Sequence, residues 1–223
     1  MSNTPSGPAF RRLDTATRRR QLLATGAALF ATQPYDEVWV DDVARTAGIS
    51  RGLLYHYFGS KRGFLSAVVE QEAATLLAVT EPDDRLPPPE RLRAVLDAYL
   101  DYVRAHPHGY RALFRGALGA DTAIRSIVDG NLARQQERVL RAVVGPGPAP
   151  EPVRLAVRGW LSFLVAVCLD WLENPVLDRT AVRELCADTL TGALGASGHG
   201  APPTPGSATD AGHRAPPRDE GGG

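Results

Sequence analysis

Apolar residues recur at helical spacing along most of the chain, and no segment alternates apolar and polar residues for long enough to predict a strand. The pattern therefore predicts an all-α fold. The expected helices cover residues 15–32, two short segments within 40–58, then 60–79, 89–106, a helix opening at Pro107, 121–144, 151–173 and 178–194.

Proline and glycine separate the later helices. Three consecutive prolines close the segment 81–89, and the run G-P-G-P-A-P fills 145–150, so a helix cannot continue through either. The tail 197–223 consists mainly of Gly, Pro, Ala, Ser and Thr and contains no large apolar residue. Because such a segment cannot offset the entropy of ordering, we expect it to be disordered.

The segment from Val40 to Phe58 reads V-D-D-V-A-R-T-A-G-I-S-R-G-L-L-Y-H-Y-F, which is typical of a helix-turn-helix. Ala44 is the small residue at the helix crossing, Gly48 occupies a turn that favours positive φ, and Ser50 is expected to cap the second helix. A small-residue turn in any helical protein is the alternative interpretation. The number of agreeing positions favours DNA binding.

These residues and their flanks, from about Thr17 to Leu65, resemble the amino-terminal domain of the TetR family of bacterial transcription regulators. The resemblance rests on the runs L-L-A-T-G-A-A-L-F, V-D-D-V-A-R-T-A-G-I-S and L-L-Y-H-Y-F-G-S-K, with Tyr35 between the first two. Two positions depart from the family pattern: Pro34 replaces a glycine, and Trp39 replaces a capping Thr or Ser. Loss of that cap costs about 1 kcal/mol.

In a helix-turn-helix the second helix, here Ser50 to Tyr57, enters the major groove. Arg51 is suited to bind guanine O6 and N7, although a phosphate contact is equally open. The resemblance implies phosphate contacts for Tyr55, His56 and Lys61, whereas core packing is the interpretation favoured for Tyr57. The predicted DNA-binding residues are Arg45, Thr46, Ser50, Arg51, Gly52, Leu53, Tyr55, His56, Tyr57 and Lys61.

Charge is distributed unevenly although the chain carries 25 basic and 25 acidic residues. Residues 1–66 hold an excess of basic groups, which suits a protein that presents one end to a polyanion. The arginines near the start either strengthen DNA attachment, our preferred interpretation, or are ordinary solvated charge. They are Arg11, Arg12, Arg18, Arg19 and Arg20.

A single reading helix spans too few base pairs for specificity, so a two-fold homodimer on a near-palindromic operator is expected. The helix 151–173 is apolar around most of its circumference and must be covered on every side. The resemblance implies that the last two helices form a four-helix interface with their mates, and a monomer core is the alternative. The predicted interface residues are Leu161, Leu164, Val167, Cys168, Trp171 and Leu172.

The middle helices are expected to enclose a pocket for an unknown small-molecule effector. Asn131 interrupts an apolar stripe and is the most suggestive polar candidate, although a core amide is the alternative interpretation. The candidate ligand-binding residues are Tyr99, Tyr102, Tyr110, Phe114, Asn131, Gln135, Trp160 and Phe163.

The resulting hypothesis is a repressor that a ligand releases from its operator, with no cofactor and no metal. An activator, a ligand-independent regulator and an interaction protein with a vestigial helix-turn-helix remain alternatives. The expected divisions are a disordered basic arm (1–14), a DNA-binding domain (15–66), an effector-binding and dimerisation domain (67–196) and the disordered tail (197–223).

Other classes of protein find little support. The sequence has no G-x-S-x-G motif, phosphate loop or metal-spaced cluster, so an enzyme is not expected. The first residues lack the apolar core of a signal peptide, and the run 160–172 is shorter than a membrane span, which predicts a cytoplasmic protein without membrane partners. Cys168 and Cys186 are expected to be buried thiols rather than a disulfide.

Overall fold

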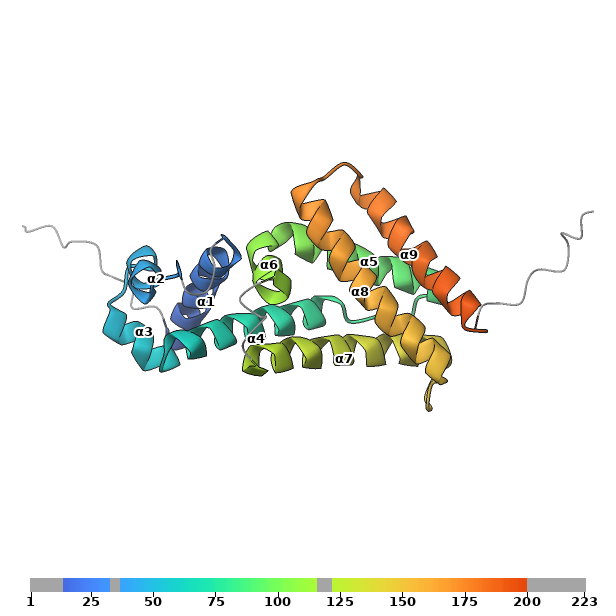
Figure 1. Cartoon of the computed structure of the whole chain (residues 1–223), viewed down its shortest axis with the longest axis horizontal. Helices are drawn as coiled ribbons and strands as arrows, with labels where there is room; N and C mark the ends of the chain where they lie inside the picture. The colour runs from blue at the N-terminus through green and yellow to red at the C-terminus, as the bar shows by residue number, and fades with distance from the viewer. Residues whose placement is uncertain (1–13, 33–36, 116–121, 200–223) are drawn as a thin grey trace, which may run out of the picture.

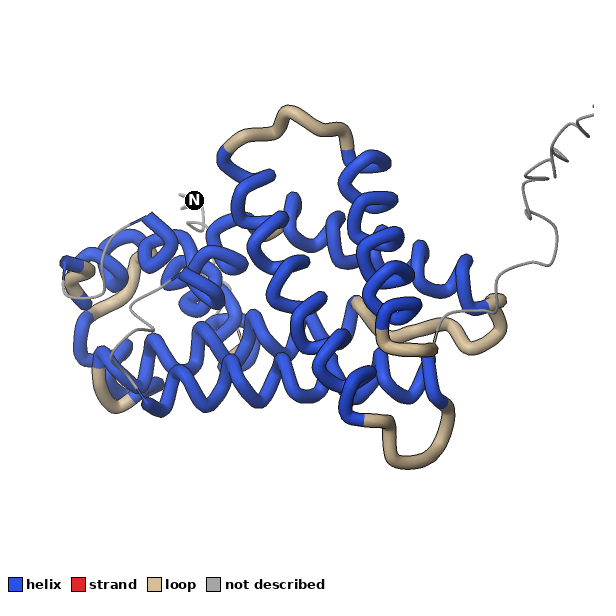
Figure 2. The backbone as a smooth tube through the Cα atoms, turned by 45° about the vertical axis from the view of Figure 1, so that its right-hand side comes forward, coloured by secondary structure: helices blue, strands red, loops and turns tan. Residues whose placement is uncertain are grey.

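The computed structural model describes residues 14–32, 37–115 and 122–199. Within these ranges the chain is helical without strands, as the sequence predicted (Figures 1 and 2). The helices are α1 (Thr15–Thr32), α2 (Val40–Thr46), α3 (Arg51–Phe58), α4 (Lys61–Val79), α5 (Pro88–Ala105), α6 (Pro107–Arg115), α7 (Thr122–Val144), α8 (Glu151–Glu173) and α9 (Arg179–Ala196).

Helix limits differ from the sequence prediction by one or two residues, mainly because capping residues lie outside the helix. Ser60 and Asp178 were placed inside helices, yet each is the N-cap whose side chain accepts a hydrogen bond from the backbone N–H of Gly63 or Ala181. The expected disorder of the arm and of the tail beyond His199 falls outside the described residues, as do Arg11, Arg12, Pro34 and Tyr35.

The head of the molecule consists of α1, α2, α3 and the first turns of α4. Its core contains Leu22 and Leu23 from α1, Val43 from α2, Leu54 from α3 and Phe64 from α4, all buried. A glycine in α1 permits the close approach of α4, because a Cβ at Gly26 would lie only 2.4 Å from Cζ of Phe64. The head therefore packs α3 against α2 and α4.

Two connections join the head to the remaining helices, which we call the body. The first is α4, which starts in the head and packs along α7 in the body, so the expected domain boundary near residue 66 falls inside a continuous helix. The second is the contact of α1 with α6, which lies between the head and the body in Figure 1. A change in the position of α6 would therefore displace α1, which is part of the head.

In the body, α8 packs against α7 and α9, and α9 also packs against α5. Among the described helices, α8 alone is long and apolar enough to meet the composition of a membrane span, whereas the sequence estimate treated its apolar run as too short. The core helix of a soluble protein meets the same criterion, and α8 buries seven residues within this chain.

Candidate nucleic-acid interface

The turn between α2 and α3 has the geometry that the sequence predicted. Gly48 adopts a positive φ of 65°, which a residue with a Cβ rarely tolerates. Ser50 then caps α3, since its Oγ accepts a hydrogen bond of 3.2 Å from the backbone N–H of Leu53. Val43 and Ala44 are buried where α2 meets its neighbours. These contacts fix the direction in which α3 leaves the turn.

Arg51 is the first residue of α3, and its side chain is 60% exposed. Its guanidinium forms an ion pair of 3.3 Å with Asp41 and lies 5.5 Å from the centre of the Tyr55 ring. Hydrogen bonding to Tyr55 and the charge of Asp41 raise the pKa of Arg51, so the group stays cationic. An exposed pair of this kind is worth about 0–1 kcal/mol, so Arg51 can exchange Asp41 for DNA at small cost.

The outward face of α3 carries Gly52, Leu53 and His56, all exposed. Leu53 is 38% exposed despite its apolar side chain, and an apolar group at this position can contact the methyl group of thymine. A Cβ at Gly52 would meet no atom within 4 Å, so the fold itself does not require glycine there. The absent side chain leaves the first turn of α3 open to close approach by a partner.

The two tyrosines of α3 are both half-buried and pack against the core of the head. The ring of Tyr57 also packs on that of Phe58, with 6.1 Å between the ring centres, whereas Tyr55 lies beside Arg51. Tyr55 thus combines a packing contact with a position on the reading face.

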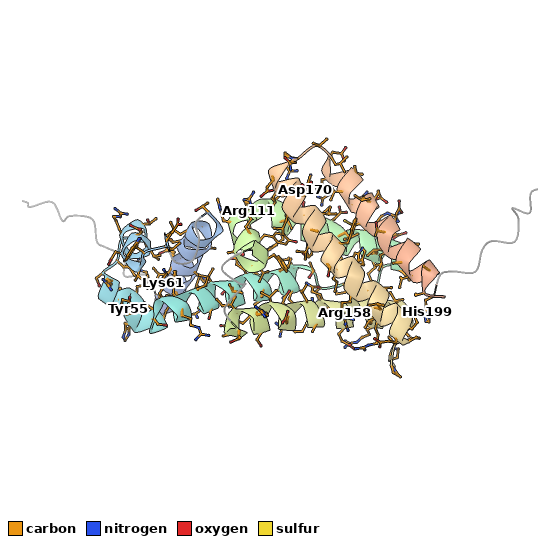
Figure 3. The ribbon with its side chains drawn as sticks, in the orientation of Figure 1. Tyr55, Lys61, Arg111, Arg158, Asp170 and His199 are labelled. Atoms are coloured by element: carbon orange, nitrogen blue, oxygen red, sulfur yellow. The ribbon has the colours of Figure 1, made fainter. Side chains whose placement is uncertain are left out.

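The α4 N-terminus lies next to the reading helix. Ser60 caps it, Lys61 is its first residue, and a Cβ at Gly63 would lie 2.3 Å from the carbonyl oxygen of Phe58. Figure 3 shows Tyr55 and Lys61 at the same end of the molecule, on α3 and at the start of α4. A basic residue at the N-terminus of a helix is suited to a phosphate.

At the end of α2, Arg45 and Thr46 are exposed, and Arg45 pairs with Asp42 within the helix. Sequence reasoning missed Trp39, which is 66% exposed and makes no side-chain hydrogen bond as the N-cap of α2. The sequence did show that Trp39 replaces the usual capping Thr or Ser, and this replacement could have marked it as a candidate. An exposed indole beside a reading head is a further candidate for contact with the DNA backbone.

The structure does not bring the predicted ligand-binding residues into one cavity. Several pair with core groups: Tyr99 Oη lies 2.9 Å from Tyr110 Oη, Tyr102 hydrogen-bonds to Glu72, and Trp160 donates to the Cys186 carbonyl at 2.8 Å. Phe114 packs on Tyr110, with 4.8 Å between the ring centres.

The two polar candidates on α7 are buried. Asn131 donates to the Ala73 carbonyl at 2.8 Å, and its Oδ1 has no hydrogen-bond partner among the described residues. Gln135 is the one ligand candidate that lines the apolar cavity at the far end of the body.

The predicted interface residues of α8 divide into two groups. Leu161, Leu164, Cys168 and Trp171 are buried within the single chain, so they belong to its core and are not available to a partner. Val167 and Leu172 are half-buried. An open apolar groove lies instead on the other faces of α8 and α9. It is lined by Pro152, Leu155, Ala156, Gly159, Trp160, Phe163, Thr189, Ala193, Ala196 and Ser197.

Both cysteines are free and buried, as the sequence predicted. Burial raises the pKa of Cys186 to about 11 and raises that of Cys168 further, so neither thiol is reactive at neutral pH. In the described ranges, no group of three His, Cys, Asp or Glu side chains is arranged to hold a metal ion.

Comparison with known proteins agrees with this geometry. Residues 22–68 match the family model for bacterial regulatory proteins of the tetR family, and residues 88–192 match that for the tetracyclin repressor-like C-terminal domain. The transcriptional activator FasR of Mycolicibacterium smegmatis is 32% identical over 77% of this chain and 81% of its own. The repressor KstR of Rhodococcus jostii is 27% identical, and the match covers 78% of this chain and 83% of KstR.

A tetR-family transcriptional regulator from Streptomyces coelicolor has a similar crystal structure, with a TM-score of 0.73, 28% identity and coverage of 83% of each chain. The matched proteins are transcription regulators and not enzymes, and they include both repressors and an activator. DNA binding through the helix-turn-helix and regulation of transcription are therefore this chain's function. The chain belongs to the TetR family of bacterial transcription regulators.

Proposed function

We propose that this protein is a homodimeric repressor that holds a near-palindromic operator with two α3 helices and is released when a small molecule binds the body. The observation that carries the proposal is the exposed face of α3, where Arg51, Leu53 and His56 project from a helix anchored by the buried Leu54. This face has the shape and chemistry that major-groove reading requires.

Each residue predicted to bind DNA has a proposed role. Arg51 binds a guanine edge, and Leu53 contacts a thymine methyl group. Tyr55, His56 and Lys61 bind phosphates and fix the register of α3, with Arg45 and Thr46 contributing from the end of α2. Ser50 holds the first turn of α3, Gly52 admits the DNA backbone, and Tyr57 supports the helix from its inner side.

The second copy is proposed to cover the apolar groove of α8 and α9. Leu155 is 63% exposed at this groove, and Gly159 and Ala193 are small enough to let helices approach closely. TetR-family regulators act as dimers, and the spacing of the two heads then sets which operators fit. Such regulators are soluble, and we propose a cytoplasmic location for this one.

Release by a ligand would use the connections between body and head. A ligand that favours one arrangement of α4 and α6 would change the position of both heads through α4 itself and through the α6–α1 contact. The coupling between ligand and DNA is then reciprocal and typically amounts to about 1–3 kcal/mol.

Activation is a second candidate, because the relative FasR is described as a transcriptional activator and matches most of this chain. The same DNA-binding face would serve either sign of regulation. A reporter gene placed behind the selected operator distinguishes the two: expression falls with a repressor and rises with an activator.

The test begins with selection of bound fragments from random DNA by the purified full chain. We expect a motif with two half-sites in inverted orientation. The variant carrying Arg51→Ala and Tyr55→Ala should bind the selected fragment at least about tenfold more weakly, a change of about 1.4 kcal/mol, in titrations at matched salt.

The matched control is Arg134→Ala, which removes an exposed arginine from α7 in the body. It should leave the affinity for the fragment unchanged. Equal affinities of the double variant and the unmodified protein would show that the assigned reading face is wrong.

A further inference from the structure

A cavity of about 360 Å³ is lined by the first turns of α5 and the last turns of α7 and α9. Figure 1 shows these helix ends at the end of the body farthest from α3. The cavity volume accommodates about a dozen groups of roughly 30 Å³, the space of a water molecule in the liquid. Among the described residues, no aromatic side chain lines the walls. The apolar lining residues are Pro82, Pro88, Pro89, Leu92, Val95, Val139, Ala142, Val143, Leu190 and Leu194.

Two buried polar side chains, those of Gln135 and Thr80, line this aliphatic space. Gln135, which is 8% exposed, donates through Nε2 to Thr80 Oγ1 at 3.2 Å, and Thr80 in turn donates to the carbonyl of Leu76 at 2.8 Å. Gln135 Oε1 accepts no hydrogen bond from the residues that the structure describes. This oxygen is not enclosed by protein atoms but is open to the cavity, where a bound hydroxyl or N–H group can donate to it.

The two cations in the lining are already compensated. Arg91 pairs with Asp84 at 3.2 Å and donates to the carbonyl groups of Asp84 and Leu86. Arg138 pairs with Glu81 and donates to the Leu77 carbonyl. Because both guanidinium groups are also bonded to backbone carbonyls, an anion would have to compete with Asp84 or Glu81 for the remaining N–H groups. A charge left unpaired in this apolar site would be strongly unfavourable.

The chain's own tail is a poor occupant. It follows α9, whose Leu194 lines the cavity, but residues 200–223 contain no Leu, Ile, Val, Met, Phe, Tyr or Trp. These residues cannot supply the apolar surface that the walls would bury. The groove of α8 and α9 proposed for the second copy shares no lining residue with this cavity.

We propose that the cavity binds an uncharged aliphatic molecule of about ten heavy atoms, a size set by the cavity volume, whose hydroxyl or amide head donates to Gln135 Oε1. This inference deepens the proposed function by naming the class of effector, and only its effect on DNA binding rests on that proposal.

The first experiment measures binding of decanol, decanoate and decylamine to the full chain without DNA, by calorimetry. We expect decanol to bind and both charged probes to bind at least about tenfold more weakly, because neither charge would find a free partner. Equal or tighter binding of decanoate or decylamine, or no binding of decanol, would overturn the assignment.

Two variants locate the site. Val95→Trp fills the cavity from α5 and should abolish decanol binding. Ala94→Trp places the same side chain on the exposed side of the same helix, outside the lining, and should leave binding unchanged. Thermal unfolding and operator binding of both variants establish that they are folded. Decanol binding that survives Val95→Trp would place the ligand elsewhere.

A third variant tests the role of Gln135. Decyl methyl ether has no hydrogen to donate, so the unmodified protein should prefer decanol by about three- to tenfold. Gln135→Leu should remove this preference even where overall affinity changes little. A retained preference would exclude Gln135 as the acceptor.

The two proposals fail separately. If decanol binds with the expected selectivity but does not change operator affinity, the cavity assignment stands and ligand release is wrong. If decanol does not bind while a different molecule lowers operator affinity, ligand release stands and the ligand class is wrong.

Discussion

At the scale of single residues, a substitution at Gly52 should affect protein stability and DNA affinity in different ways. This glycine is exposed in the first turn of α3, and a Cβ there would touch nothing in the protein. Gly52→Ala should therefore keep or raise the free energy of unfolding, by up to about 1 kcal/mol, since alanine favours helix. Operator affinity should fall at least about tenfold if the DNA backbone approaches this turn closely.

Chemical denaturation and operator titration measure the two effects. Gly130→Ala is the matched control, since a Cβ at this α7 glycine also meets nothing within 4 Å and the site lies in the body. It should change stability in the same direction and leave operator affinity unaltered. Unchanged affinity of Gly52→Ala would exclude close approach of DNA at this position.

Asn131 allows the two interpretations of a buried amide to be separated. Its Nδ2 donates to the Ala73 carbonyl, whereas its Oδ1 has no partner among the described residues. Asn131→Leu keeps the branched shape of the side chain, adds some volume and removes the unsatisfied oxygen, so the free energy of unfolding should change by less than about 1 kcal/mol. Asn131→Asp should destabilise by more, because it buries a charge.

Urea unfolding of the three proteins at neutral pH measures this difference. A large loss of stability in Asn131→Leu would show that the buried amide is a structural requirement.

At the scale of elements, charged residues connect α5 to α9. Arg93 pairs with Glu184 at 3.0 Å, Arg183 reaches both Glu184 and Asp97, and Arg179 pairs with Asp97 at 2.8 Å. These pairs lie on two helices that also line the cavity. They hold the cavity walls in register although each pair alone is worth little.

Acid should weaken this connection. Hydrogen bonds from Arg183 and Arg93 lower the pKa of Glu184 below its usual 4.5. A carboxyl group whose pKa is depressed by folding stabilises the folded state above the unfolded pKa, and this contribution disappears as pH falls through the folded value. Glu184→Gln should therefore destabilise the protein at neutral pH, and the difference from the unmodified protein should shrink below about pH 4.5.

Thermal unfolding as a function of pH measures this convergence. The control is Glu137→Gln, because Glu137 is exposed and its ion pair in the described part of the chain is with Arg141 on its own helix, at 3.8 Å. Its melting curves should follow those of the unmodified protein at every pH. A constant difference for Glu184→Gln across the range would show that the pairing of Glu184 does not depend on its charge.

At the scale of the whole molecule, the sequence was informative where a local pattern decides the structure. The spacing of Ala44, Gly48 and Ser50 predicted a turn whose φ and cap the structure confirms, because each depends on neighbouring backbone alone. The all-α class followed from periodicity in the same way.

The body was harder to predict, because the direction in which a helix face points depends on distant packing. Leu161 and Cys168 had the composition of an interface, yet α8 turns them inward. Tyr99 and Tyr110 suited a pocket wall, but they pair with each other in the core, and Tyr102 pairs with Glu72. The cavity formed instead where prolines and aliphatic residues from distant segments meet. Only Gln135 was shared by the prediction and the cavity lining.

The proposed dimer gives the last prediction, since two heads must be connected for a near-palindromic operator to be read. Leu155→Glu places a charge in the α8 and α9 groove at a site 63% exposed in the single chain, so the monomer should remain folded. Sedimentation should show a monomer where the unmodified chain is dimeric, since the charge would be buried unpaired across the interface. Arg134→Glu, an exposed change on α7 outside the groove, should stay dimeric.

Operator affinity should fall with dimer formation, because each monomer would keep the contacts of only one half-site. A single half-site should still bind Leu155→Glu as it binds the unmodified protein, since Tyr55 on α3 and Arg158 on α8 lie well apart in Figure 3. A dimeric Leu155→Glu would move the interface to another face. A monomeric Leu155→Glu with full operator affinity would instead separate dimerisation from DNA reading.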